Sequence, residues 1–206
     1  EDVGLILKAN MAKNSLVDRQ ATTNGFRSLI QGYKDRKCKI YLLHGSLTDG
    51  EMTSLYTDPK VKALISTTHG EGYGLPLFEA AYNGLPISVT NWSGHLDFLY
   101  KPVKQKNGKI KSKHMFGKIN YTLKDVQEKA VWEGVISKHS MWAFPEDGSI
   151  KANLAEIYKD HGRFVKRAKD LQKWIHEEYS QDKIYDKICD MLIMDEHSSI
   201  KKVVNL

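Results

Sequence analysis

The stretch THGEGYGLPLFEAAYNGLP at residues 68–86 places a glycine-rich loop directly before a short helix. Pro76 suits the first helical turn, where its missing N–H costs no hydrogen bond. Gly84 suits the position just after the helix, and Pro86 prevents the helix from continuing. One apolar run precedes the loop and another follows the helix. The stretch therefore predicts the order strand, glycine loop, short helix, strand.

Apolar runs alternate with helical patterns through the first half of the chain. Four runs have the composition of buried parallel strands, at residues 3–10, 39–45, 61–67 and 86–90. The alternation predicts an α/β fold with a single Rossmann-like, doubly wound parallel sheet and helices on both of its faces.

Residues 101–118 interrupt this pattern with seven lysines. Asn107 and Gly108 are a strong turn signal between alternating residues, so we expect an exposed, lysine-rich β-hairpin inserted into the domain. Two interpretations of it stay open. It is a solvated edge that resists pairing with other strands, or a patch for a polyanion or a membrane surface.

The last third of the chain has helical spacing. Four of its apolar residues share one face of an expected helix: Phe164, Ala168, Leu171 and Ile175. The sequence shows no internal repeat and no linker composition. We therefore expect one domain over residues 1–194 and a tail over residues 195–206.

Composition narrows the class of protein. No stretch approaches the roughly eighteen apolar residues of a membrane span, and no secretory leader is visible. Cys38 and Cys189 form no C-x-x-C pair, which favours a reducing compartment. We expect a cytoplasmic protein, with attachment to a membrane surface as an alternative. The net charge of +6 suits an anionic ligand, but we expect no nucleic-acid partner.

The glycine-rich loop lies where an open parallel sheet binds ligands, at the carboxyl end of a strand. A helix N-terminus there offers N–H groups and partial positive charge, which suit a phosphate. Gly72 and Gly74 let the backbone approach a ligand, because no Cβ stands in the way. Glu71 and Glu79 would repel phosphate, but each can accept hydrogen bonds from a vicinal diol. The combination describes a nucleoside diphosphate that carries a sugar.

Two other phosphate-binding motifs are not satisfied. The G-x-G-x-x-G pattern fails because Leu77 stands where the third glycine would be, and no P-loop pattern occurs. Taken alone, the glycines leave two interpretations open: a ligand-binding loop and a structural tight turn.

The segment HGEGYGLPLFEAAYNGLPISVTNWSG at residues 69–94 resembles the donor-binding half of retaining glycosyltransferases with the GT-B fold, the family 4 (group 1) type. The family motif is E-G-F-G-L-x-x-x-E-A-x-x-x-G-x-P. The matching residues, with Tyr in place of Phe, are Glu71, Gly72, Tyr73, Gly74, Leu75, Glu79, Ala80, Gly84 and Pro86. Weaker similarity at residues 43–66 and 174–188 extends over most of the chain. The resemblance implies one half of a GT-B fold.

The resemblance also implies roles for the motif residues. Glu71 would contact the transferred sugar as a catalytic residue, and Glu79 would hold the ribose hydroxyls. The amides of the loop would meet sugar hydroxyls and phosphate, with donor-binding residues Gly72, Tyr73, Gly74 and Leu75.

The family uses an arginine and a lysine on the diphosphate, after the first strand of this half. In the segment LKANMAKNS, Lys13 stands in the place of the lysine and is the second catalytic candidate. No arginine directly precedes it, so Lys8 and Arg19 are the candidate substitutes. Asn10, in the same segment, is a further donor-binding candidate.

Three more donor-binding candidates flank the motif. His69 faces the sugar or acceptor, or is held in place for structural reasons; both interpretations stay open. Ser93 and Gly94 follow the fourth strand, so we expect them at the same edge of the sheet, lining the donor site.

We expect no metal and no cofactor besides the nucleotide sugar. No D-x-D occurs, and the histidines form no H-x-H or H-x-x-x-H pair. Lysine, helix dipole and backbone donors would neutralise the leaving diphosphate instead. The resemblance implies a hexosyltransferase-like enzyme that transfers sugar with retention of configuration to an acceptor of unknown class, a glycan, a lipid or a protein.

A GT-B enzyme has two such domains, and this chain accounts for the second. We therefore expect an N-terminal acceptor domain in the same or another chain, and a chain that binds donor but transfers sugar poorly alone. Two alternatives stay open. One is a non-catalytic nucleotide-sugar-binding remnant or interaction module, and the other is a GT-B-like nucleotide-sugar epimerase, which would not need the double-glutamate motif.

Overall fold

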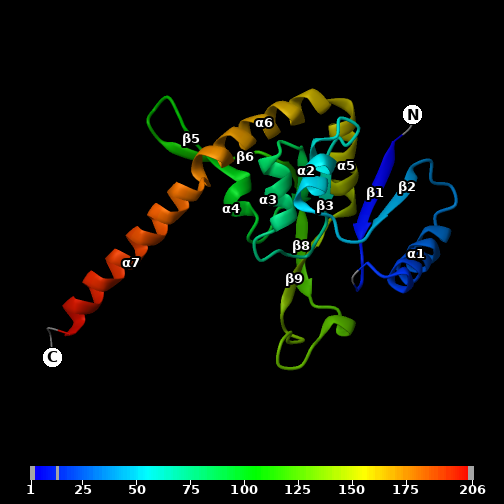
Figure 1. Ribbon diagram of the computed structural model, residues 1–206, viewed down its shortest axis with the longest axis horizontal. Helices are drawn as coiled ribbons and strands as arrows, with labels where there is room; N and C mark the ends of the chain where they lie inside the picture. The colour runs from blue at the N-terminus through cyan, green and yellow to red at the C-terminus, as the bar shows by residue number, and fades with distance from the viewer. Residues whose placement is uncertain (1–2, 13, 204–206) are drawn as a thin grey trace. The chain divides into compact units, whose positions relative to one another are not determined.

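The computed structural model in Figure 1 describes residues 3–12 and 14–203, and for residues 193–203 it describes the backbone alone. The chain divides into two compact units, Glu1–Ser54 and Leu55–Leu206. We call them unit 1 and unit 2 and describe each by itself. Among the described residues, no helix combines the length and the apolar character that crossing a membrane requires.

Unit 1 is one parallel β-α-β arrangement. It contains β1 (Gly4–Ala9), α1 (Leu16–Gln31) and β2 (Lys39–His44), and β1 pairs in parallel with β2. Ser15 caps α1, since its side chain accepts a hydrogen bond from the amide of Asp18 at 3.1 Å. The first strand was expected to be buried, but Leu5 and Ile6 are exposed. A two-stranded sheet with one helix cannot cover both faces of a strand.

Helix α2 (Asp49–Thr57) begins in unit 1 and ends in unit 2. Thr48 and Glu51 form a reciprocal capping box at its start. The hydroxyl of Thr48 accepts from the amide of Glu51 at 3.3 Å, and the carboxylate of Glu51 accepts from the amide of Thr48 at 2.8 Å. The amide of Thr48, and also its hydroxyl, donate to the Glu51 carboxylate and hold the pKa of Glu51 below its usual value.

The core of unit 2 is a three-stranded parallel sheet in the order β3–β4–β7. Its strands are β3 (Leu64–Ser66), β4 (Ile87–Thr90) and β7 (Gly117–Ile119), and α3 (Leu75–Tyr82) connects the first two. All four residues of the central strand β4 are buried. The order strand, glycine loop, helix, strand is thus confirmed.

The mixed α/β class is confirmed, but a single doubly wound sheet is not observed. The described strands form four separate small sheets, of which β1–β2 and β3–β4–β7 are parallel. The other two sheets are antiparallel pairs, each of two strands that lie close together in the sequence.

The expected lysine-rich hairpin is present. Strands β5 (Tyr100–Lys104) and β6 (Ile110–His114) pair in antiparallel register around a turn at Gly108, whose φ is +80°. The hairpin is shorter than the expected 101–118, because residues 115 and 116 are buried and β7 begins at Gly117. In Figure 1 it projects beyond α4 (Leu96–Leu99) and α6 (His161–Glu178).

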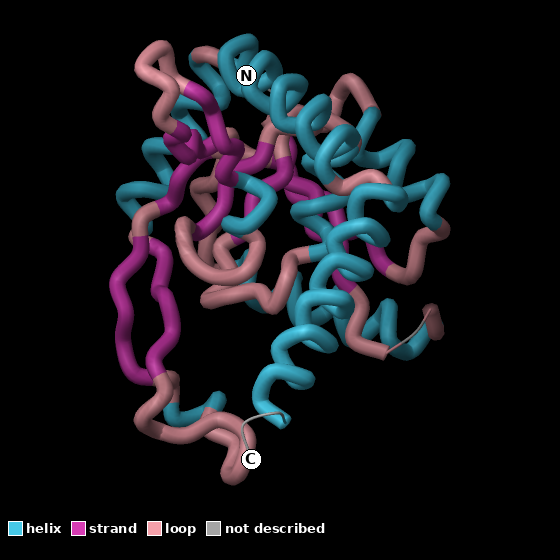
Figure 2. The backbone as a smooth tube through the Cα atoms, turned by 90° about the vertical axis from the view of Figure 1, so that its left-hand side faces the viewer, coloured by secondary structure: helices cyan, strands magenta, loops and turns pink. Residues whose placement is uncertain are grey.

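A second antiparallel ribbon was not expected from the sequence. Strands β8 (Tyr121–Asp125) and β9 (Met141–Pro145) form it, and the segment between them includes a short 3-10 helix at Glu128–Ala130. Figure 2 shows this ribbon extending away from the other strands of unit 2.

The described part of the chain ends in three helices, α5 (Asp147–Lys159), α6 and α7 (Gln181–Val203), of which α5 contacts β7 and α6 contacts α3. The expected inner face of α6 is confirmed, since Phe164, Ala168, Leu171 and Ile175 are all buried. The side chains of Gln172 and His176 donate to the carbonyl of Tyr82 and fix α6 on α3. Helix α7 reaches into the expected tail, and the division at residue 194 stays a prediction.

Candidate functional site

The glycine-rich loop joins the carboxyl end of β3 to the start of α3. Gly74 has a left-handed φ of +84°, and its carbonyl accepts hydrogen bonds from the amides of Leu77 and Phe78 at 2.9 and 3.0 Å. A Cβ at Gly74 would lie 3.1 Å from the Cβ of His95. Backbone conformation and close packing therefore both require glycine at this position.

A second loop, at the carboxyl end of β4, holds the first one. The hydroxyl of Ser93 accepts from the amide of Glu71 at 3.0 Å and donates to the carbonyl of the same residue at 2.6 Å. The amide of Gly94 donates to that carbonyl as well, at 3.1 Å. We call these three contacts the Ser93 clasp. They bring together Glu71, Ser93 and Gly94, which the sequence predicted at the same edge of the sheet.

The loop after β4 has an unusual backbone conformation at the clasp. Ser93 has a φ of +91°, a conformation that costs free energy in a residue with a Cβ. A Cβ on Gly94 would lie 1.9 Å from the carbonyl oxygen of Gly72. The two loops are therefore in direct backbone contact, and only glycine fits at Gly94.

The loop presents unpaired backbone donors. Within the described part of the chain, no group accepts a hydrogen bond from the amides of Gly72, Tyr73, Gly74 or Leu75. No atom lies within 4 Å of the place where a Cβ of Gly72 would be, and Leu75 is 63% exposed. Successive free N–H groups at the start of a helix make a site for anionic oxygens.

Aromatic packing fixes Tyr73 within the loop. Its ring centroid lies 5.2 Å from that of Phe98 and 5.7 Å from that of Phe78. Burial of the phenol, and the nearby Asp97 carboxylate, raise the pKa of Tyr73. The side chain therefore anchors the loop as a neutral ring, while its backbone stays at the surface.

Glu79 is exposed on α3, and a buried tyrosine orients it. The hydroxyl of Tyr56 donates to a carboxylate oxygen of Glu79 at 3.1 Å. Burial, and then the Glu79 carboxylate, raise the pKa of Tyr56 well above its usual value, so the hydroxyl keeps its proton. The sequence did not indicate Tyr56 as a residue of the site. Nothing in its spacing indicates a bond to a residue 23 positions away.

His69 is held by β9. Its Nδ1 donates to the carbonyl of Ala143 at 2.9 Å, and its ring stacks on Trp142 with centroids 5.2 Å apart. The ring of Phe144 lies against it at 4.4 Å. These contacts hold the ring in place, and its role in facing the sugar or acceptor stays a prediction.

His95 lies buried beneath the loop. Its Nε2 donates to the carbonyl of Thr90 at 2.8 Å, whereas its Nδ1 has no partner among the described residues. Burial lowers the pKa of His95, against the opposing effects of the Thr90 carbonyl and the Glu71 carboxylate. The imidazole is therefore neutral near pH ~7.

The candidates before α1 lie in unit 1. The amine of Lys8 donates to the carbonyl of Gly45, Asn10 is exposed just after β1, and Lys13 lies outside the described residues. Arg19 is exposed on α1. Lys8 is thus hydrogen-bonded to the backbone. The structure describes no contact of Lys13, which stands in the place of the family's lysine.

Asp18 fastens the loop between β1 and α1. It accepts from the amide of Met11 at 3.1 Å and lies 2.9 Å from Nε2 of His44. Burial alone would raise the pKa of Asp18, but His44 and the amides of Ala12 and Met11 together hold it below its usual value. Sequence reasoning did not identify this pair, which joins residues 26 positions apart.

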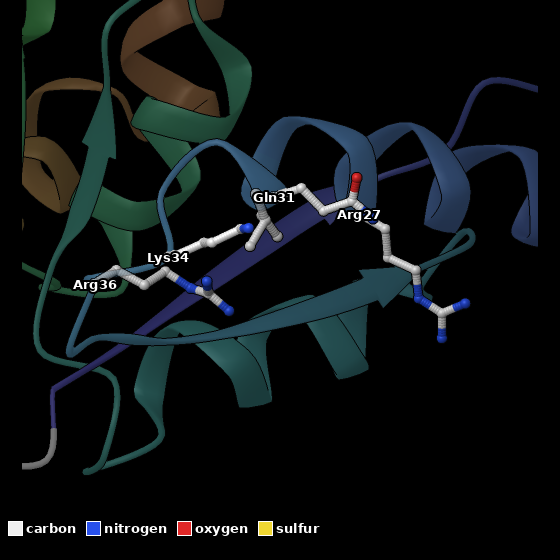
Figure 3. Close-up of a pocket in the computed structure, with 5 residues that line it drawn as sticks. Arg27, Gln31, Lys34 and Arg36 are labelled. Atoms are coloured by element: carbon white, nitrogen blue, oxygen red, sulfur yellow. The ribbon is translucent and has the colours of Figure 1, made fainter.

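Two surface hollows are lined by residues outside the glycine-rich loop. One, of about 480 Å³, lies in unit 1 and is lined by Arg27, Ile30, Gln31, Lys34 and Arg36. Figure 3 shows the guanidinium of Arg27 well apart from that of Arg36, so the two charges do not converge on one point. The other, in unit 2, lies at the carboxyl end of α3 and includes Gly84 and Lys169. In the loop itself, Gly72, Tyr73 and Leu75 are exposed.

Among the described residues, no group of three or more His, Cys, Asp or Glu side chains could hold a metal ion. No family model matches the chain, and no curated protein matches it.

Two glycine substitutions test the contact between the loops. Gly94→Ala should lower the free energy of unfolding by about 1–3 kcal/mol, because its Cβ overlaps a backbone oxygen. Gly72→Ala, the matched control, meets open space and has no left-handed φ, so its effect should be within about 0.5 kcal/mol. Denaturant unfolding measures both. Equal stabilities of the two variants would contradict the described contact.

The buried His95 predicts a pH dependence of stability. Because its pKa is lowered in the folded chain, the unfolded chain binds a proton where the folded chain does not. Stability should be fully present above pH ~6.5 and decrease as the pH falls below that value. Burial and three nearby cations lower the pKa of His114 as well, so His114 should also reduce the stability of the fold at low pH.

Unfolding experiments across this range should therefore give a shallower pH dependence for His95→Gln than for the unchanged chain. An identical slope would show that His95 titrates alike in the folded and unfolded states.

Proposed function

We propose that this chain binds a nucleoside diphosphate sugar at the loop of residues 71–75. The observation that carries the proposal is the row of unpaired amides at the start of α3, which the Ser93 clasp holds in a fixed conformation. Because these donors are already oriented, a ligand that binds them does not have to order the loop.

The diphosphate is assigned to the amides and not to the acidic side chains. The partial positive charge at the start of α3 and the free N–H groups favour anionic oxygens, whereas carboxylates repel them. Glu71 and Glu79 are assigned to the neutral hydroxyls at the two ends of the ligand, the transferred sugar and the ribose. The Tyr56 hydroxyl positions the Glu79 carboxylate for this role.

We assign this binding site to an enzyme, a retaining, hexosyltransferase-like glycosyltransferase with the GT-B fold. The chain is its donor-binding domain, with the Rossmann-like doubly wound sheet of that half. The support is the motif at residues 71–86 together with the parallel strand–helix–strand arrangement observed within each unit. An N-terminal domain, in the same or another chain, supplies the acceptor site.

Metal-free binding is part of the proposal. The backbone donors of the loop and lysine side chains neutralise the leaving diphosphate. The resemblance to the family assigns Lys13 to it as the second catalytic residue, and Lys8 and Asn10 are proposed as further donor-binding residues. The leaving phosphate assists deprotonation of the acceptor, a glycan, a lipid or a protein.

Calorimetric titration with UDP, GDP, ADP and their sugar conjugates tests the proposal. One nucleotide should bind with a dissociation constant on the order of micromolar to millimolar, and with equal affinity in EDTA. Glu79→Ala should lose about 1–3 kcal/mol of binding free energy, because the ribose hydroxyls lose a charged acceptor. Tyr56→Phe should lose less, since it only removes the group that orients this carboxylate.

Glu177→Ala is the matched control, because Glu177 is also an exposed helical glutamate and its removal changes the net charge equally. It should bind as the unchanged chain does. Folded protein that binds none of the nucleotides would overturn the proposal and favour a non-catalytic interaction module.

A further inference from the structure

The β5–β6 hairpin carries an unbalanced positive charge. Its register pairs Lys101 with Lys113 and Val103 with Lys111. Because side chains alternate between the faces of a strand, one face gathers four of the lysines. These are Lys101, Lys109, Lys111 and Lys113. We call residues 100–114 the lysine ribbon.

The ribbon has almost no counter-charge. Its sequence, YKPVKQKNGKIKSKH, contains six lysines and no acid. Of the six ribbon lysines, only Lys101 has an ion pair within the described part of the chain, with Asp170 of α6 at 2.5 Å. Like charges directly opposite each other destabilise an antiparallel pair. The hairpin therefore carries a charge arrangement that weakens its own pairing.

The base of the ribbon extends the positive region. Burial lowers the pKa of His114, and so do the nearby charges of Arg167, Lys118 and Lys113. Among the described residues, no carboxylate raises the pKa of His114. Two cations outside the ribbon, Lys118 of β7 and Arg167 of α6, thus add to the field of the lysine face.

Protection of a sheet edge does not account for this arrangement. An edge resists pairing when it carries any exposed charge, and a glutamate would do so without repelling the lysine opposite. One sign of charge on both strands, with no acid among them, instead matches an extended anionic surface.

The residue types favour a membrane over a nucleic acid. All six cations are lysines, which act as point charges without the bidentate geometry that arginine offers to individual phosphates. The only aromatic ring besides His114, that of Tyr100, packs on Phe116, and its hydroxyl donates to Asn91. It cannot serve for base stacking. Meanwhile Ile110 is 73% exposed beside the turn, where it can enter the headgroup region.

We propose that the lysine ribbon docks this chain on a membrane surface rich in anionic lipids. The inference rests on the charges of the hairpin and not on nucleotide binding at the glycine-rich loop. Binding should be reversible and should weaken as salt rises, because screening shortens the reach of the exposed charges.

Vesicle co-sedimentation of the full chain tests the proposal. Vesicles of phosphatidylcholine and phosphatidylserine, in a ratio of about 7:3, should bind the chain, and vesicles of phosphatidylcholine alone should not. Replacing Lys109, Lys111 and Lys113 by Gln should weaken partitioning on the order of a hundredfold. Replacing the same three by Arg should preserve it, because the charge is kept.

A charge-matched control separates the ribbon from net charge. Replacement of Lys60, Lys151 and Lys159 by Gln removes the same charge at exposed positions outside the ribbon and should leave partitioning unchanged. Far-UV circular dichroism verifies that each variant is folded. The proposal is overturned if the unchanged chain does not bind the anionic vesicles, or if both triple Gln variants lose partitioning equally. It is also overturned if only an oligonucleotide binds.

Discussion

The geometry of the candidate site depends on one pair of hydrogen bonds, those between the Ser93 hydroxyl and the backbone of Glu71. They join the loops that follow β3 and β4, two neighbouring parallel strands. The left-handed φ of Ser93 costs free energy, and these two hydrogen bonds stabilise the residue in that conformation. Without the two bonds, the contact of Gly94 with Gly72, and the direction of the free amides, would be lost.

This constraint explains why the loop can be open and still be ordered. A surface loop of glycines loses much conformational entropy when it is fixed. Here the ring of Tyr73 anchors it to Phe98 from one side and the clasp fixes it from the other. The orientation of Glu79 has a separate origin in the Tyr56 hydroxyl, which is itself buried.

The sequence predicted those features that local patterns determine. The loop and α3 follow from the placement of Gly74 and Pro76, and the lysine ribbon follows from the turn at Gly108. The buried face of α6 follows from helical spacing. Ser93 and Gly94 were placed beside the loop correctly, since parallel strands end at the same edge of a sheet.

What the sequence did not reveal depends on contacts between distant residues. The bonds of His69 to Ala143 and of Tyr56 to Glu79 join positions that no periodicity relates. The β8–β9 ribbon has 15 residues between its strands, too many for a short turn signal to identify the pairing. Which strands pair with which is likewise not determined by the strand pattern, because that pattern fits one sheet equally well.

Backbone amide chemical shifts test the central claim most directly, since they report on the donors themselves. The isotope-labelled chain would be titrated with the sugar conjugates of UDP, GDP and ADP. The account predicts the largest shifts at Gly72, Tyr73, Gly74 and Leu75 for the conjugate that binds. A conjugate that binds and shifts only residues around the unit 1 hollow, such as Arg27 and Gln31, while these four amides stay unchanged, would contradict it.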